Sequence, residues 1–316
     1  MPSLDPVILF FLLGAFAGLA RAELRLPAAI YDFVSTLLLL AIGLKGGVEL
    51  ARSGAGLPLI ELAALLALGI GLTIPAFLAA RYLGGLSRAD SASLAAHYGS
   101  VSVGTFAVLV AYLATRGIEY EVRAPVWVVV LEVPAILAGV VLARGFGGGD
   151  VAWKPLLREL MLGRSVILLL GGLAIGWVSG PEGTASIQPL FFGLFKGILA
   201  LFLLEMGLIA ATQLGALKRN AVFLVLFGVG MPLFGALVGA LLGLALGLSI
   251  GGTIVMATLG ASASYIAAPT AMRTAVPEAN PALSLTASLA VTFPFNIIIG
   301  IPLYERLARS ILQGMG

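Results

Sequence analysis

Two short stretches of small and polar residues stand out in this chain: GSVSVGT over residues 99–105, and GASASY over residues 260–265 with Pro269 close behind. Each interrupts a long apolar run in which Leu, Ile and Val otherwise predominate. Inside hydrocarbon, helical backbone can be interrupted only where protein or a water-filled cavity surrounds it. The matching interruptions therefore predict a binding site at the centre of a membrane protein. Close helix packing through small residues is the plainer alternative.

The composition is that of a polytopic membrane protein. Of 316 residues, 60% are hydrophobic and 10% charged, whereas soluble domains carry roughly 45–50% apolar and about 25% charged residues. A span needs about 20 apolar residues, and long continuous runs exclude a transmembrane barrel. We therefore predict an all-α protein with ten transmembrane spans, at residues 6–20, 31–51, 57–82, 90–115, 124–144, 163–179, 189–213, 220–247, 252–276 and 283–308.

The basic residues set the expected orientation. When the loops are assigned to alternate sides of the ten spans, eleven of the 18 Lys and Arg residues fall opposite the termini and five fall on the side of the termini. Basic loops stay in the cytoplasm, so both termini are predicted to lie outside it. The expected location is a bacterial inner (plasma) membrane.

Three weak internal similarities recur about 160 residues apart. Residues 40–44 resemble 204–208, the Ser-x-Ser interruption of the fourth span matches that of the ninth, and the fifth and tenth spans contain Pro134 and Pro294. A repeat with an odd number of spans has its two copies in opposite orientations, as in secondary transporters. The predicted parts are a first five-helix repeat at 1–145, a cytoplasmic connection at 146–162 and a second repeat at 163–316.

Charged and strongly polar residues inside the spans are candidates for function, because a charge at the bilayer centre costs at least about 2.5–3.5 kcal/mol. Glu132, next to the helix-kinking Pro134, can ligate sodium or carry a proton. Lys45 and Glu205 lie on repeat-related spans and can form a structural ion pair, although snorkelling of Lys45 from a helix end is a close alternative. Asn296 either caps freed backbone or faces the cavity.

The chemistry of the two breaks suits an anion and a cation together. Half-helix N-termini carry partial positive charge and favour an anion, while freed carbonyls and Ser or Thr hydroxyls favour sodium. His97 adjoins the first break, but we expect a packing role for it, and we expect Arg273 to anchor its span at the interface. The candidate ligands for ion or substrate are Gly99, Ser100, Ser102, Gly104, Thr105, Glu132, Ser262, Ser264, Tyr265 and Asn296.

Around these residues the sequence resembles a known family. ASASYIAAPTAMR over residues 261–273, continuing to VPEANP over 276–281, resembles the signature of the sodium-dependent bicarbonate transporters. The resemblance runs over nearly the whole chain. Stretches similar to the family's other landmarks follow in the right order at residues 42–47, 99–105, 132–135 and 206–207.

The resemblance implies a ten-helix inverted-repeat fold, akin to bile-acid/sodium symporters and sodium/proton antiporters, and assembly as a homotrimer. Bicarbonate and sodium would be held at the broken helices and transported by an elevator-like movement. The moving core would comprise residues 57–144 and 220–308, and the scaffold 6–51 and 163–213. By the same resemblance, the candidate sodium ligands are Ser102, Thr105, Glu132 and Ser264.

Two features depart from the family pattern. Tyr265 stands where cyanobacterial members carry an aspartate, which leaves the substrate open. The connection over residues 146–162 is shorter than in those members, so control by a PII-like regulatory protein is not expected.

The expected function is sodium-coupled import of a small anion, with bicarbonate favoured and no cofactor besides the coupling Na+. A symporter for small monocarboxylates on the same fold is the main alternative, with Tyr265 filling the space of the family's aspartate. An intramembrane enzyme would need a nucleophile, a base or a set of metal ligands inside the bilayer. A chain with no cysteine and one histidine offers few residues for these roles. A passive channel gives no reason for paired broken helices.

Overall fold

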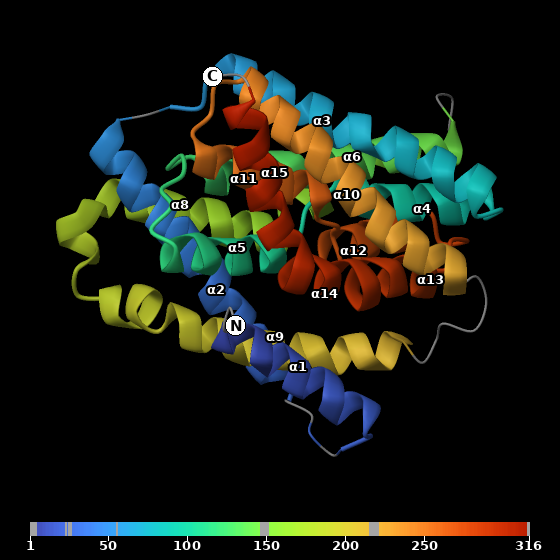
Figure 1. Ribbon diagram of the computed structural model, residues 1–316, viewed down its shortest axis with the longest axis horizontal. Helices are drawn as coiled ribbons and strands as arrows, with labels where there is room; N and C mark the ends of the chain where they lie inside the picture. The colour runs from blue at the N-terminus through green and yellow to red at the C-terminus, as the bar shows by residue number, and fades with distance from the viewer. Residues whose placement is uncertain are drawn as a thin grey trace.

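A computed structural model describes residues 5–22, 24, 27–54, 56–145, 152–214 and 221–314, and every regular element among them is helical (Figure 1). The predicted all-α class is therefore confirmed for this part of the chain. The α-helices are α1 (Pro6–Leu19), α2 (Ala28–Ser53), α3 (Leu59–Leu78), α4 (Arg88–Gly99), α5 (Val103–Thr115), α6 (Ala124–Arg144), α7 (Trp153–Met161), α8 (Arg164–Thr184), α9 (Phe195–Leu214), α10 (Ala221–Ala245), α11 (Ile250–Ala261), α12 (Ala267–Ala275), α13 (Pro281–Leu285), α14 (Phe293–Phe295) and α15 (Ile301–Gln313). Four π-helical segments are η1 (Ala79–Leu83), η2 (Pro189–Gly193), η3 (Thr286–Thr292) and η4 (Asn296–Gly300).

The length and apolarity of the helices confirm a polytopic membrane protein. Among the described residues, 8 helical stretches are long and apolar enough to cross a bilayer. The predicted spans 6–20 and 252–276 correspond to shorter apolar helices, α1 and the α11 that precedes a break. The predicted connection contains α7, a helix of 9 residues. Residues 146–151 of that connection and residue 220 of the eighth predicted span lie outside the described ranges.

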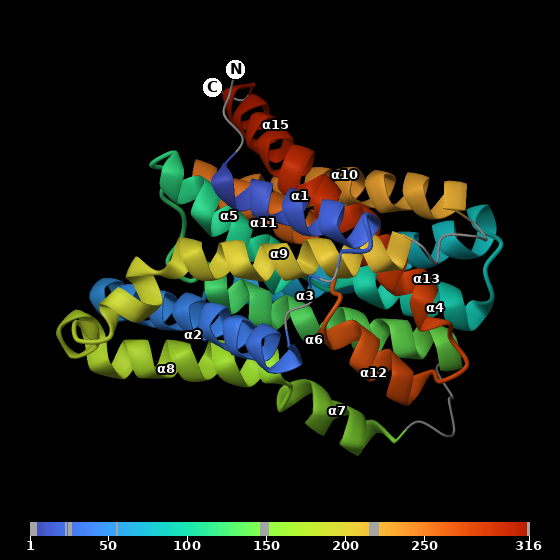
Figure 2. The same cartoon turned by 90° about the horizontal axis from the view of Figure 1, so that it is seen from below.

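Glycines let two pairs of helices approach closely. α1 packs against α9, and a Cβ on Gly14 or Gly207 would overlap the backbone of the opposite helix. α2 packs against α8 in the same way, at Gly43 and Gly176. Small residues at a crossing allow backbone contact, which is a common basis of helix association in lipid. Figure 2 shows the four helices in the order α1, α9, α2, α8, with α9 next to α2.

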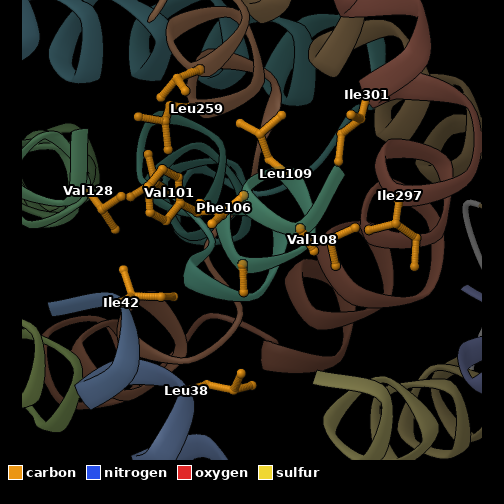
Figure 3. Packing of buried hydrophobic residues seen from close by; sticks show 14 of the residues in the cluster. Leu38, Ile42, Val101, Phe106, Val108, Leu109, Val128, Leu259, Ile297 and Ile301 are labelled. Carbon is orange, nitrogen blue, oxygen red and sulfur yellow. The ribbon is translucent and has the colours of Figure 1, made fainter. Parts of the chain in front are cut away.

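The segment formed by α4 and α5 lies at the centre of the bundle. Its most apolar window is 100% buried, whereas the corresponding window of α3 with η1 is 33% buried and faces outward for most of its length. Figure 3 shows Phe106 and Leu109 of α5 packed among Ile42 of α2, Leu259 of α11 and Ile297 of η4. The first of the two predicted interruptions therefore lies inside protein, where interrupted backbone can be accommodated.

Candidate functional site

The first break separates α4 from α5. α4 ends at Gly99, and Ser100 is extended, with φ −90° and ψ 174°. Helix resumes at Val103 after Ser102, whose hydroxyl accepts a hydrogen bond from the Thr105 amide at 3.0 Å. Ser102 is thus the N-cap of α5, because it satisfies one of the amides that have no partner within the helix.

The second break separates α11 from α12 and is longer. α11 ends at Ala261, and Ser262 is extended, with φ −82° and ψ 163°. The Ser264 hydroxyl accepts from the Ala268 amide at 3.2 Å, in the first turn of α12. Both breaks fall within the small and polar stretches, as the sequence predicts.

The two breaks are hydrogen-bonded directly to one another. The Ser102 amide donates to the Ser262 hydroxyl at 3.1 Å, and that hydroxyl donates in turn to the Leu259 carbonyl at 2.9 Å. The Ser264 amide donates to the His97 carbonyl at 2.8 Å. All of these residues except Leu259 are polar, and all are buried. Residues 160 positions apart in the sequence therefore meet at one buried point, from which α5 and α12 begin.

Asn296 supports the second break from η4. Its amide nitrogen donates to the Ala261 carbonyl at 2.9 Å, and its amide oxygen accepts from the Tyr304 hydroxyl at 2.6 Å. Asn296 is fully buried, at 0% exposure. Of the two roles left open by the sequence, these bonds match the capping of freed backbone at the end of α11.

Glu132 of α6 supports the first break through its backbone. The Ser100 hydroxyl donates to the Glu132 carbonyl at 3.1 Å. The carboxyl group is buried, the Ser165 hydroxyl of α8 is its hydrogen-bonding neighbour, and its Oε2 has no hydrogen-bond partner in the described part of the chain. A buried carboxyl oxygen without a partner is costly unless an ion or a proton satisfies it.

Tyr265 lies against the first turn of α5. A Cβ added to Gly104 would overlap the Tyr265 hydroxyl oxygen, so this glycine makes the close approach possible. The tyrosine ring packs edge-on to Phe293, with centroids 5.3 Å apart and planes at 70°. The hydroxyl is buried and has no hydrogen-bond partner of ordinary geometry among the residues described. Gly99 is equally confined, because a Cβ there would overlap the Thr73 hydroxyl of α3.

The remaining sequence candidates lie outside this cluster or play local roles. The His97 ring bonds through Nδ1 to the Ser93 carbonyl at 2.7 Å, within its own helix. Arg273 is exposed near the end of α12. Lys45 is exposed and Glu205 is half-buried, and the structural ion pair between them stays a prediction.

A buried ion pair at the start of α3 is absent from the sequence predictions. Glu61 accepts hydrogen bonds from the Arg123 guanidinium, through Nε at 2.7 Å and through Nη2, and from Trp127 Nε1 at 3.2 Å. The hydrogen-bonded Glu61 carboxylate raises the pKa of the Arg123 guanidinium. Arg123 appears in the sequence only as a basic loop residue, and its partner lies 62 positions away. The sequence signal that could have indicated this pair is Glu61 itself, a carboxylate near the start of a predicted span.

The point where the two breaks meet offers uncharged oxygens and helix amides to a ligand. Hydroxyls of Ser102, Ser262 and Ser264 and the interrupted backbone cluster there, and the Ser100 hydroxyl is bonded to the backbone carbonyl of Glu132. Oxygen ligands of this kind suit a hard cation, and the amide ends of α5 and α12 suit an anion. The described residues contain no group of three or more His, Cys, Asp or Glu that could hold a metal ion.

An all-helical, polytopic membrane protein with two discontinuous helices that meet at its buried centre has the design of a secondary transporter. The profile of the Na+-dependent bicarbonate transporter superfamily matches residues 6–309. The chain belongs to this superfamily, which confirms the resemblance seen in its sequence. No curated protein matches the chain in sequence.

Proposed function

We propose that the protein is a symporter that couples the entry of a small anion, bicarbonate before others, to the entry of sodium. The observation that carries the proposal is the hydrogen bond between the two breaks, from Ser102 to Ser262, in a member of a sodium-dependent bicarbonate transporter superfamily. A second bond, from Ser264 to His97, ties the second break to the last turn of α4. Two broken helices that meet in this way present helix N-termini and freed carbonyl oxygens to one point.

Sodium binds first in this proposal, because its charge lowers the cost of bringing an anion into a low-dielectric cleft. The proposed sodium ligands are Ser102, Thr105, Glu132 and Ser264. The unpartnered carboxyl oxygen of Glu132 supports its inclusion. The anion is proposed to contact Gly99, Ser100, Gly104, Ser262 and Tyr265, while Asn296 holds the end of α11. If sodium ions outnumber the anion, the membrane potential contributes about 2.3 kcal/mol per net charge per 100 mV.

Transport proceeds, in the same proposal, by movement of a core (57–144 and 220–308) against a scaffold (6–51 and 163–213). Ten spans in two inverted repeats underlie this division. The pairing of α1 with α9 and of α2 with α8 supports it, because a two-fold axis that exchanges the repeats would convert one pair into the other. The protein is proposed to be a homotrimer of a bacterial inner membrane, with both termini outside the cytoplasm, no cofactor and no PII-like regulator.

A symporter for small monocarboxylates is the second candidate, and Tyr265 favours it. The Phe202 ring lies beside Gly104, and the Tyr265 ring packs edge-on against Phe293, so aromatic carbon surrounds the Tyr265 hydroxyl. An apolar surface accommodates the methyl group of acetate or the carbon skeleton of pyruvate better than it accommodates bicarbonate.

Ligand-induced stabilisation of the purified protein tests the proposal and separates the two candidates. A ligand that binds only the folded state stabilises it by about 2.7 kcal/mol at 100 times its Kd. We expect sodium, but not potassium, to raise Tm, and bicarbonate to raise it further only when sodium is present. A greater effect of acetate or pyruvate than of bicarbonate would favour the monocarboxylate transporter. No sodium-dependent shift with any small anion would contradict both.

A further inference from the structure

An apolar groove runs along the outside of the bundle between α3 and α6. Its volume is about 700 Å³, and every residue that lines it is apolar. Along α3 the lining extends from Leu62 to Ile74, and along α6 from Val129 to Leu142. At 1.5 Å per residue these stretches are about 18–20 Å long, slightly more than one leaflet's share of a hydrocarbon core about 30 Å thick. The groove therefore has the length of one acyl chain.

A second hollow lies beside α7, and its lining includes charged residues, although most of the surface that they present to it is apolar. Its volume is about 480 Å³, and Lys154, Arg158 and Glu159 of α7 line it together with Pro155 and Leu162. Met161, one helical turn after Arg158, belongs to the lining of the apolar groove. One short helix thus contributes to both hollows, which places its two cations near the apolar groove.

The two faces of α7 explain how it is held in this position. Leu156 and Leu160 are buried in a cluster with Ile136 of α6 and Ala268 of α12, while Lys154 and Arg158 are exposed. Figure 2 shows α7 on the outside of the bundle, beside α8 and α12. A short helix with one apolar face and basic residues on the other is typical of the membrane interface.

The charges of α7 are available to a ligand. Neither Lys154 nor Arg158 takes part in the ion pairs of the described residues, whereas Arg144 and Arg164, which flank α7 in the sequence, are paired with Glu278 and Asp32. Two cations outweigh the one carboxylate, Glu159, that shares their hollow. This balance favours an anionic head group next to an apolar chain.

We propose that the groove and the α7 hollow form one binding site for an anionic phospholipid. The phosphate lies at Lys154 and Arg158, and one acyl chain lies between α3 and α6. Val166 of α8 lines the same groove. If the core moves against the scaffold, which rests on the proposed function, then the lipid spans the moving boundary and its binding favours one position of the core.

Lipid binding to the purified full chain tests the site without any transport measurement. We expect native mass spectrometry to detect bound phosphatidylglycerol in preference to phosphatidylcholine with the same acyl chains. The double substitution Lys154→Gln with Arg158→Gln removes both cations, and at about fivefold per charge it is expected to weaken phosphatidylglycerol binding roughly 30-fold. Lys196→Gln with Arg306→Gln is the matched control, because both residues are exposed and the change in charge is the same.

A substitution in the groove tests the acyl-chain half. Ala138→Trp fills the groove from α6, while Val225→Trp places the same side chain on an exposed position of α10. Only Ala138→Trp is expected to reduce phosphatidylglycerol binding, with Tm within a few degrees of wild type. Glycerol phosphate, which has the head-group charge without chains, is expected not to compete. Equal binding of the two lipids would overturn the proposal, and so would competition by glycerol phosphate. If Ala138→Trp lost oligomers but kept its lipid, the groove would instead bind a second copy of the chain.

Discussion

Replacement of Asn296 tests how the second break is held. Asn296→Ala removes the donor to the Ala261 carbonyl and the acceptor of the Tyr304 hydroxyl, and both remaining groups stay buried. Hydrogen bonds between helices of membrane proteins contribute about 0.6 kcal/mol on average and up to about 1.7. Two such bonds give an expected loss of about 1–3 kcal/mol in the free energy of unfolding. The carbonyl that loses its partner ends α11, directly before Ser262, so the loss falls on the break itself.

Tyr304→Phe separates the two bonds. This substitution leaves the Asn296 bond to Ala261 intact and removes only the hydroxyl that Asn296 accepts from. We expect about half the loss seen for Asn296→Ala. Because Tyr304→Phe leaves the Ala261 carbonyl capped by Asn296, we also expect the sodium-dependent stabilisation to survive in Tyr304→Phe and to weaken in Asn296→Ala.

Thermal unfolding of the purified protein in detergent is a suitable assay. A change of 1 kcal/mol corresponds to roughly 2–4 °C in Tm for soluble domains of 150–250 residues, so Asn296→Ala is expected to unfold several degrees below wild type. If Asn296→Ala unfolded at the wild-type temperature and bound sodium as well as wild type, the reasoning about the capped break would be refuted.

Two further substitutions probe contacts found only in the structure. Gly104→Ala places a Cβ on the Tyr265 hydroxyl, and the overpacking is expected to lower the free energy of unfolding by about 1–3 kcal/mol. Adding Tyr265→Phe to this variant removes the hydroxyl oxygen and is expected to recover part of the loss in Tm. Glu61→Gln leaves the Arg123 guanidinium without its buried carboxylate and is expected to lower Tm strongly. Glu49→Gln is the control and is expected to lower Tm far less, because the ion pair of Glu49 with Arg52 is exposed and such pairs contribute about 0–1 kcal/mol. Equal effects of Gly104→Ala with and without Tyr265→Phe, or of Glu61→Gln and Glu49→Gln, would contradict these assignments.

The central features of the fold could be predicted because each has a local cause in the sequence. Long apolar runs predict spans, and the small, polar stretches beginning at Gly99 and Gly260 predict breaks, since such residues neither favour helix nor suit lipid. The two Ser-x-Ser motifs lie in breaks that meet in the structure, where the Ser102 amide is hydrogen-bonded to Ser262, and the inverted repeat stays a prediction.

What the sequence left open depends on contacts between distant segments. Periodicity does not say which helix lies opposite Asn296, so its cap on Ala261 emerges only from the packing of η4 against α11. The same holds for the Tyr265 hydroxyl against Gly104. α7 is too short for a hydrophobic window to detect and lies in what the sequence suggests is a plain connection. Its role follows from Leu156 and Leu160, which bury one face against α6 and α12.

Uptake of labelled bicarbonate into proteoliposomes tests the central claim most directly. Wild-type protein is expected to accumulate bicarbonate when sodium is higher outside than inside, and not when potassium replaces sodium. Ser262→Ala, which removes the acceptor of the Ser102 amide, is expected to lose most of this uptake. Ser91→Ala, which removes a buried hydroxyl of α4 that has no hydrogen-bond partner in the described residues, is expected to retain it. Wild-type protein without sodium-gradient-dependent uptake of bicarbonate or of any other small anion would contradict the account, and so would Ser262→Ala with undiminished uptake.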